Sequence, residues 1–408
     1  MKNRKDKQGR RLEKGEMQRS EDLLYIYKYV DVLGKTKRIY AKTLQELREK
    51  EQQIKRDQMD GLDVYVAGDA DLNYVFDRYI STKTELRKTT MTNYMYMYDK
   101  FVRDSFGKLK VRSIVFSQVV AFYKQLHDVQ GLEYATVDTI NTMLHPAFDM
   151  AVRDNIIRNN PSYGAMKDIK KKFGKNKGIR NALTAEQQKA FLTYVRESKV
   201  HWRWDNLFTV LFGTGLRISE CVGLRWEDID LDNKIINVNH QAVYFARKPP
   251  HFEISLPKTD QGIRVVPMMP KVYEAFKSEY EWQSEHGFCT SEIDGMSGFI
   301  FCNRFGTIHI PQTINRAIHR IVDNYNAEEE VNAKKEKREP VLIPQFSCHT
   351  CRHTFCSRLC EVETNIKKIQ MIMGHKDIST TMDIYAEVSD ASKTESIENL
   401  AELCYNIF

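Results

Sequence analysis

Residues 348–360, "CHTCRHTFCSRLC", combine four cysteines and two histidines within thirteen positions. Cysteine and histidine are the usual ligands of zinc, so one interpretation of this stretch is a metal site. A second interpretation considers only His349 and Arg352, which lie about one helical turn apart. Zinc needs four converging ligands, and no second pair follows at zinc-finger spacing. The sequence therefore favours cysteines that pack in the core as small apolar side chains.

The length, net charge and cysteine count of the chain indicate a multidomain protein of the cytoplasm. The chain has 408 residues, which is long for one core, so we expect two or three domains. The net charge of +7 is a mild basic excess whose distribution matters more than its size. No apolar run approaches the length of a membrane span, and the basic N-terminus lacks the apolar segment of a secretory signal. Eight cysteines in such a chain indicate reduced thiols.

Residues 1–65 predict a small basic domain. After about twenty strongly basic and mobile residues, "LLYIYKYVDVLGKTKRIYAK" is rich in tyrosine and β-branched residues, which predicts a hairpin or three-stranded sheet. Thr43 and Glu46 have capping-box spacing, so a helix should follow. The basic strands favour DNA binding over a merely solubilising role. Their candidate DNA contacts are Lys28, Lys37 and Arg38.

Residues 66–166 predict a helical domain that follows a short linker, "VYVAGDAD". Tyr94, Tyr98 and Phe101 recur at helical spacing, and we expect this stripe to face the core rather than to stack on bases. Basic residues gather at the expected helix ends and loops. Two of them are candidate DNA contacts, Arg87 and Lys88.

Residues 167–181, "KDIKKKFGKNKGIRN", predict an interdomain linker. The stretch is punctuated by glycine, strongly basic and almost without apolar residues, so it could lie along a phosphate backbone. Its candidate DNA contacts are Lys171, Lys172, Lys175 and Lys177.

Residues 182–392 predict a mixed domain that opens on a capping box of Thr184 and Gln187. "NLFTVLFGTGLRISECVGLRWEDID" predicts a helix, a tight turn and a helix, while "KIINVNHQAV", "GIRVVPMM" and "GFIFCNRFG" predict strands. "AEEEVNAKKEKREP" predicts a solvated surface loop, and helical patterning returns from residue 345. Residues 393–408 predict an amphipathic helix that packs on its own domain or on a neighbouring subunit.

Several charged or nucleophilic residues in this third region stand in turn contexts. "TGLRISE" presents Arg217, "GHKD" presents His375 and "TTMDIYAEV" presents Tyr385. None of them is specific alone. In this order, with "HTCRH" between them, they closely resemble the tyrosine recombinase (phage-type integrase) family, whose pattern is Arg, Lys, His-x-x-Arg, His or Trp, then Tyr.

The resemblance implies a set of catalytic residues: Arg217, Lys258, His349, Arg352, His375 and Tyr385. The two guanidiniums would clamp the nonbridging oxygens of a phosphodiester, and His375 would donate a further hydrogen bond to them. Tyr385 would attack phosphorus and form a 3′-phosphotyrosyl bond. His349 would serve as the acid/base group, and Lys258 would protonate the leaving 5′-hydroxyl.

Three more residues have weaker assignments. Glu220 is expected to orient the site, and Arg225 and Arg264 are expected to be structural or to contact DNA. The resemblance implies neither a metal nor another cofactor. The sequence itself offers no convincing carboxylate cluster for a metal nuclease and no nucleotide-binding glycine loop.

The N-terminal segment resembles the arm-binding domain of integrases from conjugative transposons. The implied fold is multidomain α+β, with a small sheet-plus-helix arm domain, a helical core-binding (SAM-like) domain and a mainly helical catalytic domain with a small antiparallel sheet. The implied function is integration and excision of a mobile element. The implied partners are double-stranded DNA core and arm sites, further copies in a homotetramer, and accessory excision or DNA-bending proteins, with no membrane.

Three alternatives stay open. A resolvase-type tyrosine recombinase for replicon dimers would usually lack the N-terminal sheet. A catalytically silent DNA-binding regulator would not need the intact set of catalytic residues. A zinc protein built around residues 348–360 would need ligands that the spacing does not supply.

Overall fold

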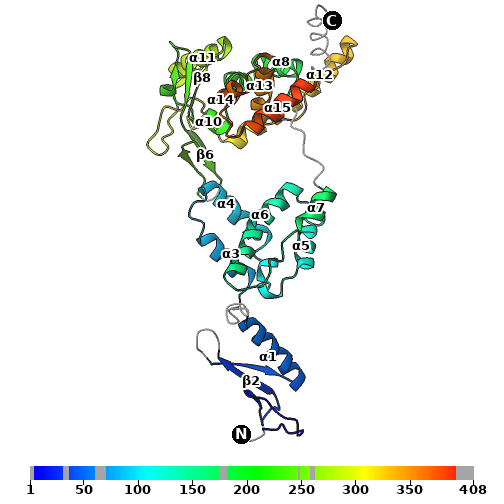
Figure 1. The fold of residues 1–408 in the computed structure, drawn as a ribbon. Helices are drawn as coiled ribbons and strands as arrows, with labels where there is room; N and C mark the ends of the chain where they lie inside the picture. Colours follow the sequence, from blue (N-terminus) through cyan, green and yellow to red (C-terminus); the bar gives the residue numbers. More distant parts are fainter. Residues whose placement is uncertain are drawn as a thin grey trace, which may run out of the picture. The chain divides into compact units, whose positions relative to one another are not determined.

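The structure of the protein is a computed structural model that describes residues 4–30, 36–59, 70–173, 182–246, 249–257 and 262–391. The chain divides into two compact units, Met1–Gly178 and Ile179–Phe408, and each is described by itself (Figure 1). Within the described ranges, the helices are all too short or too polar to cross a bilayer.

The N-terminal part of the first unit is a three-stranded antiparallel sheet with one helix. Its elements are β1 (Glu16–Gln18), β2 (Tyr25–Val30), β3 (Thr36–Ala41) and α1 (Leu44–Met59), with strand order β1-β2-β3. Tyr25 and Tyr27 of β2 pack with Leu44 and Leu47 of α1 in a small core of their own. Thr43 Oγ1 accepts the Glu46 N–H at 3.1 Å, so the predicted capping interaction is present.

Strand β1 lies in the stretch whose basic composition predicted a mobile segment, and that prediction is wrong for residues 16–18. The carboxylate of Glu16 is fully buried and accepts the Arg48 Nε at 3.0 Å. A strand of three residues carries too little periodicity to be recognised. Its ion pair with a helix thirty-two residues later fixes it in place.

Residues 70–173 form a helical domain around one apolar core, as predicted. Its elements are α3 (Leu72–Ser81), α4 (Lys88–Phe101), η1 (Phe106–Lys108), η2 (Val111–Ser113), α5 (Phe116–Asp128), α6 (Tyr134–Arg153) and α7 (Met166–Phe173). The rings of Phe76 and Tyr98 stack with centroids 3.5 Å apart. Tyr98 is fully buried, which confirms that the tyrosine stripe of α4 faces the core.

Helix α7 corrects the predicted start of the interdomain linker, because residues 167–173 are helical. Ile169 is buried and Met166 packs on the same core. The two residues stand three positions apart and therefore share one apolar face, which holds the helix against the core. Lys167, Lys170 and Lys171 are exposed, as expected for a helix whose other face is solvated. Residues 174–181, the remainder of the predicted linker, lie outside the described residues.

The second unit combines helices with two small antiparallel sheets. Its helices are α8 (Ala185–Glu197), η3 (Trp202–Trp204), α9 (Asp205–Thr214), α10 (Ile218–Gly223), η4 (Trp226–Asp228), α11 (Pro270–His286), α12 (Pro311–Glu336), α13 (Cys348–Val362), α14 (Ile366–Met373) and α15 (Ile378–Ala391). Its strands are β4 (Ile229–Asp230), β5 (Ile235–Val238), β6 (Gln241–Phe245), β7 (His251–Ser255) and β8 (Arg264–Pro267). Among the described strands, β4, β5 and β8 form one sheet in that order, and β6 pairs with β7.

Some predicted elements of this unit are confirmed and others are not. Thr184 and Gln187 cap α8 reciprocally, as predicted. "KIINVNHQAV" is two strands rather than one, because the chain leaves β5 at Asn239 and the His240 ring, through Nε2, bonds the Gly223 carbonyl at 2.7 Å. In "GFIFCNRFG" the residues Phe299 to Phe301 are buried, but the segment makes only isolated bridges, one of which joins Phe299 to Arg225.

The charged segment "AEEEVNAKKEKREP" is largely helical, and the predicted surface loop is wrong. Helix α12 continues through it to Glu336 and ends where Lys337 adopts a left-handed φ of 53°. Ala333 is buried, and the Glu329 carboxylate pairs with Arg338 Nη2 at 2.9 Å. The buried Ala333 and the ion pair between Glu329 and Arg338 stabilise the last turns of α12, although the composition of this segment alone suggested a solvated loop.

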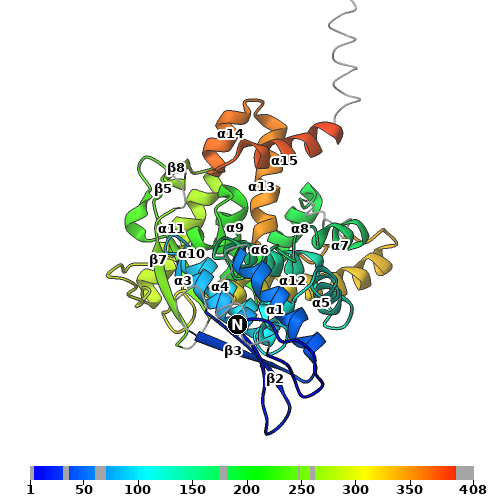
Figure 2. The same ribbon diagram turned by 60° about the horizontal axis from the view of Figure 1, so that its bottom comes forward.

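Helix α13 joins two apolar clusters. Its first turn, with Cys348 and Cys351, belongs to the large core of the unit, whereas Cys356 and Cys360 belong to a smaller cluster with α14 and α15. All four thiols are buried, which confirms that they pack as core residues. Figure 2 shows α13 leading from the region of α9 to α14 and α15. The helix that carries His349 and Arg352 is thereby fixed at both ends.

Candidate active site

The site begins at a tight turn between α9 and α10. Gly215 ends α9 with a left-handed φ of 63°, and a Cβ there would stand 2.4 Å from Cδ1 of Phe355. Both constraints require glycine. Its carbonyl oxygen accepts Arg352 Nη1 at 2.7 Å, and two residues later Arg217 begins α10 as its N-cap. The turn therefore brings two arginines from distant parts of the chain together.

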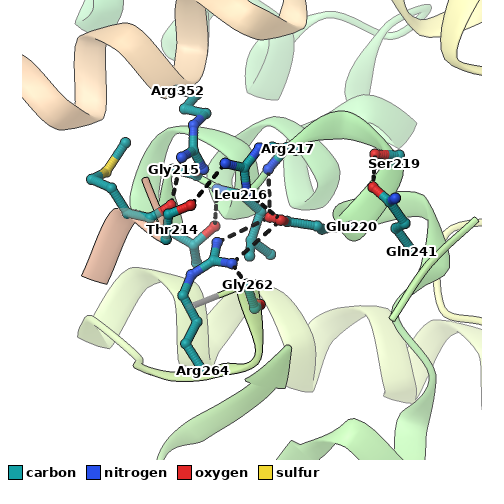
Figure 3. Close-up of polar contacts among 12 residues, drawn as sticks. Thr214, Gly215, Leu216, Arg217, Ser219, Glu220, Gln241, Gly262, Arg264 and Arg352 are labelled. Atoms are coloured by element: carbon teal, nitrogen blue, oxygen red, sulfur yellow. Dashed lines mark hydrogen bonds and ion pairs between the residues drawn. The ribbon is translucent and has the colours of Figure 1, made fainter. Parts of the chain in front are cut away.

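Glu220 is the anionic centre of the site (Figure 3). Its carboxylate accepts the Arg217 N–H at 2.9 Å, Arg217 Nη1 at 2.7 Å and Arg264 Nη2 at 2.9 Å. Its side chain is only 3% exposed. Burial alone would raise the pKa of Glu220, but the hydrogen bond and charge of Arg264, with the charge of Arg217, outweigh it and hold the pKa at about 2. The carboxylate is therefore ionised and fixes two guanidiniums.

The C-terminal end of α14 supplies the other partners of the arginines. The last carbonyls of a helix have no intrahelical donor and carry the negative end of its dipole. Here residues 372–374 turn their carbonyls to three guanidiniums, and Gly374 closes the helix with a φ of 62°. The bonds are Arg264 Nε to Ile372 O at 2.9 Å, Arg352 Nη2 to Met373 O at 2.5 Å and Arg217 Nη2 to Gly374 O at 2.8 Å.

This arrangement leaves the two guanidiniums able to bind an anion. Each terminal guanidinium nitrogen carries two N–H groups, and the bonds to Glu220 and the carbonyls fix the planes of Arg217 and Arg352. Burial, and then the charge of Arg217, lowers the pKa of Arg352 to about 9, so the group still carries its charge at neutral pH. Among the described residues of the site, three arginines stand against the carboxylate of Glu220 and make it electropositive.

His375 follows Gly374 directly and is buried beside these arginines. Its Nδ1 lies 2.9 Å from the hydroxyl oxygen of Thr381, which is also buried. Burial, and then the charges of Arg352 and Arg217, lowers the pKa of His375 to about 3. The imidazole is therefore neutral at pH 7 and serves as a hydrogen-bonding group rather than a cation.

The two remaining described candidates sit on helices that border the site. His349 is exposed near the start of α13, one turn before Arg352. Tyr385 is half-buried on α15 and packs against the smaller cluster. Lys258 lies between β7 and β8, outside the described residues.

The structure thus brings together Arg217, Arg352, Glu220 and His375, and adds two groups. Arg264 was predicted only as structural or DNA-contacting. Its side chain is 6% exposed, and its donors point to Glu220 and α14. Thr381 was not predicted. The only sequence signal for it is its place four residues before Tyr385, on the same helical face.

The candidate DNA contacts outside the site are mostly solvent-facing. Lys28 and Arg38 are exposed cross-strand partners of β2 and β3, where like charges gather on one face. Arg225 is largely buried and pairs with Asp228 at 3.7 Å. Lys37 is half-buried, and Arg87, Lys88 and Lys171 are exposed. The side chain of Lys172 lies outside the description, as do residues Lys175 and Lys177.

The cysteines of α13 do not converge as metal ligands would. Burial raises the pKa of Cys348 to about 12 and holds that of Cys351 well above its usual value, which keeps both thiols protonated. In the ranges that the structure covers, no group of three or more His, Cys, Asp or Glu side chains could hold a metal ion.

Two family descriptions match the chain. The phage integrase family matches residues 181–392, and the DNA binding domain of Tn916 integrase matches residues 1–58. The transposase from transposon Tn916 of Enterococcus faecalis is 29% identical over 410 residues, covering 97% of this chain and 96% of that protein. The ICEBs1 integrase of Bacillus subtilis is 25% identical and covers 76% and 77% of the two chains.

A solved structure is also similar. A fragment of the Tn1549 transposon integrase in complex with transposon right end DNA has a TM-score of 0.70 and 28% sequence identity. The match covers 81% of this chain and all of that fragment. The similarity therefore extends well beyond the catalytic motif.

Proposed function

Since the chain belongs to the phage integrase family, we propose that it is a site-specific recombinase of a conjugative transposon. It cuts and rejoins DNA through a 3′-phosphotyrosyl intermediate, and so integrates and excises the element. The relatives support this assignment, because the Tn916 transposase matches along nearly its whole length and the N-terminal match is to a Tn916 integrase domain.

One observation carries the proposal: Arg217 and Arg352 are held side by side by Glu220, Gly215 and the end of α14. Attack on a phosphodiester places additional negative charge on its nonbridging oxygens. Two fixed guanidiniums stabilise that charge with paired donors and need little reorganisation. Neutral His375 adds a further donor.

The proposed cleavage step is a transesterification. The hydroxyl oxygen of Tyr385 attacks phosphorus and loses its proton to a base, for which His349 is the candidate. The bond between phosphorus and the 5′ oxygen breaks, and Lys258 gives a proton to that leaving oxygen. Rejoining reverses these steps with a new 5′-hydroxyl. The phosphodiester energy is kept in the phosphotyrosyl bond, so no ATP is needed.

The other modules suit recognition rather than chemistry. We assign arm-site binding to residues 1–65 and core-site binding to residues 66–166. Residues 167–181 are the connecting segment, and residues 182–392 carry catalysis. Residues 393–408 lie outside the description, and docking on a neighbouring copy stays a prediction for them. The protein works as a homotetramer on DNA in the cytoplasm, together with accessory excision or DNA-bending proteins.

The Tyr385→Phe variant tests the proposal. Removing one hydroxyl deletes the nucleophile, so we expect normal binding of core-site DNA but no covalent adduct with a nicked suicide substrate. Denaturing gel electrophoresis detects the adduct. Tyr280→Phe is the matched control, because Tyr280 is a half-exposed tyrosine of α11 in the same unit. This control should form adduct at the wild-type rate.

The same assay in excess EDTA asks whether a metal takes part. Because the proposed step uses only side chains, adduct formation by the wild type should continue. An adduct in Tyr385→Phe would contradict the assignment of the nucleophile, and loss of the wild-type adduct in EDTA would contradict the metal-free mechanism.

A further inference from the structure

We propose that Thr381 is a positioning residue that holds His375 in the tautomer with its proton on Nε2. The catalytic consequence rests on the proposed function, but the tautomer itself does not. His375 Nδ1 and Thr381 Oγ1 are in contact, 2.9 Å apart. The distance alone does not show which of the two groups donates; the direction depends on where the Thr381 hydroxyl proton can find an acceptor.

Threonines inside helices can donate their hydroxyl proton to the carbonyl three or four residues earlier. Thr139 and Thr142 of α6 do so, at 2.9 Å to Ala135 O and to Asp138 O. Thr381 makes no such bond in the described part of α15, where its hydroxyl bonds only the imidazole. It is also fully buried, so water cannot take the proton.

The hydroxyl proton of Thr381 must therefore point at Nδ1, since a buried donor without an acceptor is costly. A ring nitrogen that accepts a hydrogen bond carries no proton. In a neutral imidazole the other nitrogen then carries it, so His375 has Nε2–H. Burial of the ring, and then the charges of Arg352, Arg217, Arg264 and His349, lower the pKa of His375 and so disfavour a second proton.

The backbone around His375 keeps the ring in this orientation. The His375 N–H donates to Gln370 O at 3.2 Å, and Gln370 Nε2 donates to His375 O at 3.0 Å. The residue is thus held at both backbone groups and at Nδ1. The ring is therefore fixed as a donor through Nε2–H, which suits an anionic ligand at the arginines.

Thr381 also stands one turn before Tyr385 on α15, so one helix carries the nucleophile and the group that orients His375. Seating α15 against α13 and α14 should set both at once. Displacement of α15 would deprive the site of the nucleophile and of the oriented donor together.

The tautomer can be measured directly in the full-length protein. Histidine labelled with ¹⁵N gives distinct shifts for protonated and bare ring nitrogens, and His375→Asn identifies the signal. At pH 7 without DNA, we expect a bare Nδ1 and a protonated Nε2. Thr381→Ser keeps the hydroxyl and should keep this pattern. Thr381→Val has nearly the same shape without the hydroxyl, and should move protons onto Nδ1.

Adduct formation supplies the second readout. Hydrogen-bond partners that orient a metal-ligating histidine contribute about 10- to 100-fold, and we expect a similar factor at this histidine. Thr381→Val should therefore slow adduct formation by roughly that factor, while Thr381→Ser stays within about threefold. A protonated Nδ1 in the wild type, or an unchanged tautomer in Thr381→Val, overturns the inference. If the wild type forms no adduct, the proposed function fails but the tautomer result stands.

Discussion

Arg103 and Glu220 each bind two oppositely charged partners, but in opposite surroundings. Arg103 of the helical domain pairs with Asp77 at 2.9 Å and with Asp99 at 2.7 Å, where all three side chains are at least 30% exposed. Glu220 pairs with two arginines in the interior of the second unit. The helical domain keeps its charges at the rim of an apolar core. In the second unit the side chains of Glu220 and Arg264 are buried, while that of Arg217 is 38% exposed.

The exposed ion pairs of Arg103 only stabilise the fold, whereas the Glu220 cluster positions groups that can bind a ligand. A buried charge is costly unless every partner is present, and an apolar replacement of similar volume is often at least as stable. The Glu220 cluster is therefore a poor way to gain stability. It is a good way to hold guanidiniums in a fixed plane, which is what phosphate binding needs.

The largest expected effect lies in the apolar core. Phe148 of α6 is fully buried, so Phe148→Ala should destabilise the helical domain by about 4 kcal/mol through lost burial and a cavity. Hydrogen exchange of amides in α6 measures the change. Amides of α10 serve as the control, because the cores of the two units share no residue. Equal losses in both helices would show that the two interiors are not independent.

A somewhat smaller effect distinguishes buried from surface charge. Arg264→Met leaves Glu220 buried with one guanidinium fewer, and should destabilise α10 by about 3 kcal/mol. Arg103→Met is the matched control and should cost at most about 1 kcal/mol, since exposed pairs contribute little. Denaturant-dependent hydrogen exchange compares the two. Similar costs for both variants would remove the contrast between the two regions.

The smallest effect appears in the pH dependence. The pKa of His375 is about 3 when folded and about 6.5 when unfolded, so its contribution is complete above pH 6.5 and is lost as pH falls. Between pH 6.5 and 5 the unit should lose about 2 kcal/mol. Below pH 4.5 Glu220 adds a second loss, because its folded pKa is about 2. Urea unfolding across this range, with the helical domain as reference, measures both.

His375→Asn separates the two contributions. It should abolish the loss between pH 6.5 and 5 and, below pH 4.5, leave only the part that comes from Glu220, which is unchanged. A variant that retains the first loss would assign it to another group.

Local patterns predicted much of this molecule. The caps at Thr43 and Thr184, the tyrosine stripe of α4 and the turn before Arg217 depend on neighbours within one or two helical turns, so sequence spacing reveals them. The burial of the four cysteines of α13 could also be predicted, because a small apolar side chain needs no particular partner in a core.

Contacts between distant residues were not accessible from sequence. Strand β1 depends on an ion pair with Arg48, and the end of α12 depends on Arg338. The role of Arg264 follows from its contacts with Glu220 and with the Ile372 carbonyl, which lies 108 residues later in the chain. In the site, motif residues could be named one by one, whereas the backbone groups that hold them have no side-chain signature.

The end of α14 has a consequence for how the site responds to mutation. Its three acceptors are main-chain carbonyls, which no point substitution can delete, and the side chains of Ile372 and Met373 take no part in those bonds. A substitution can displace these carbonyls only by changing the backbone conformation. The most sensitive position is Gly374, whose left-handed conformation disfavours any side chain. The side chain at position 372 can therefore vary while the arginines stay in place, whereas Met373 is constrained by its burial in the smaller cluster and Gly374 by its backbone conformation.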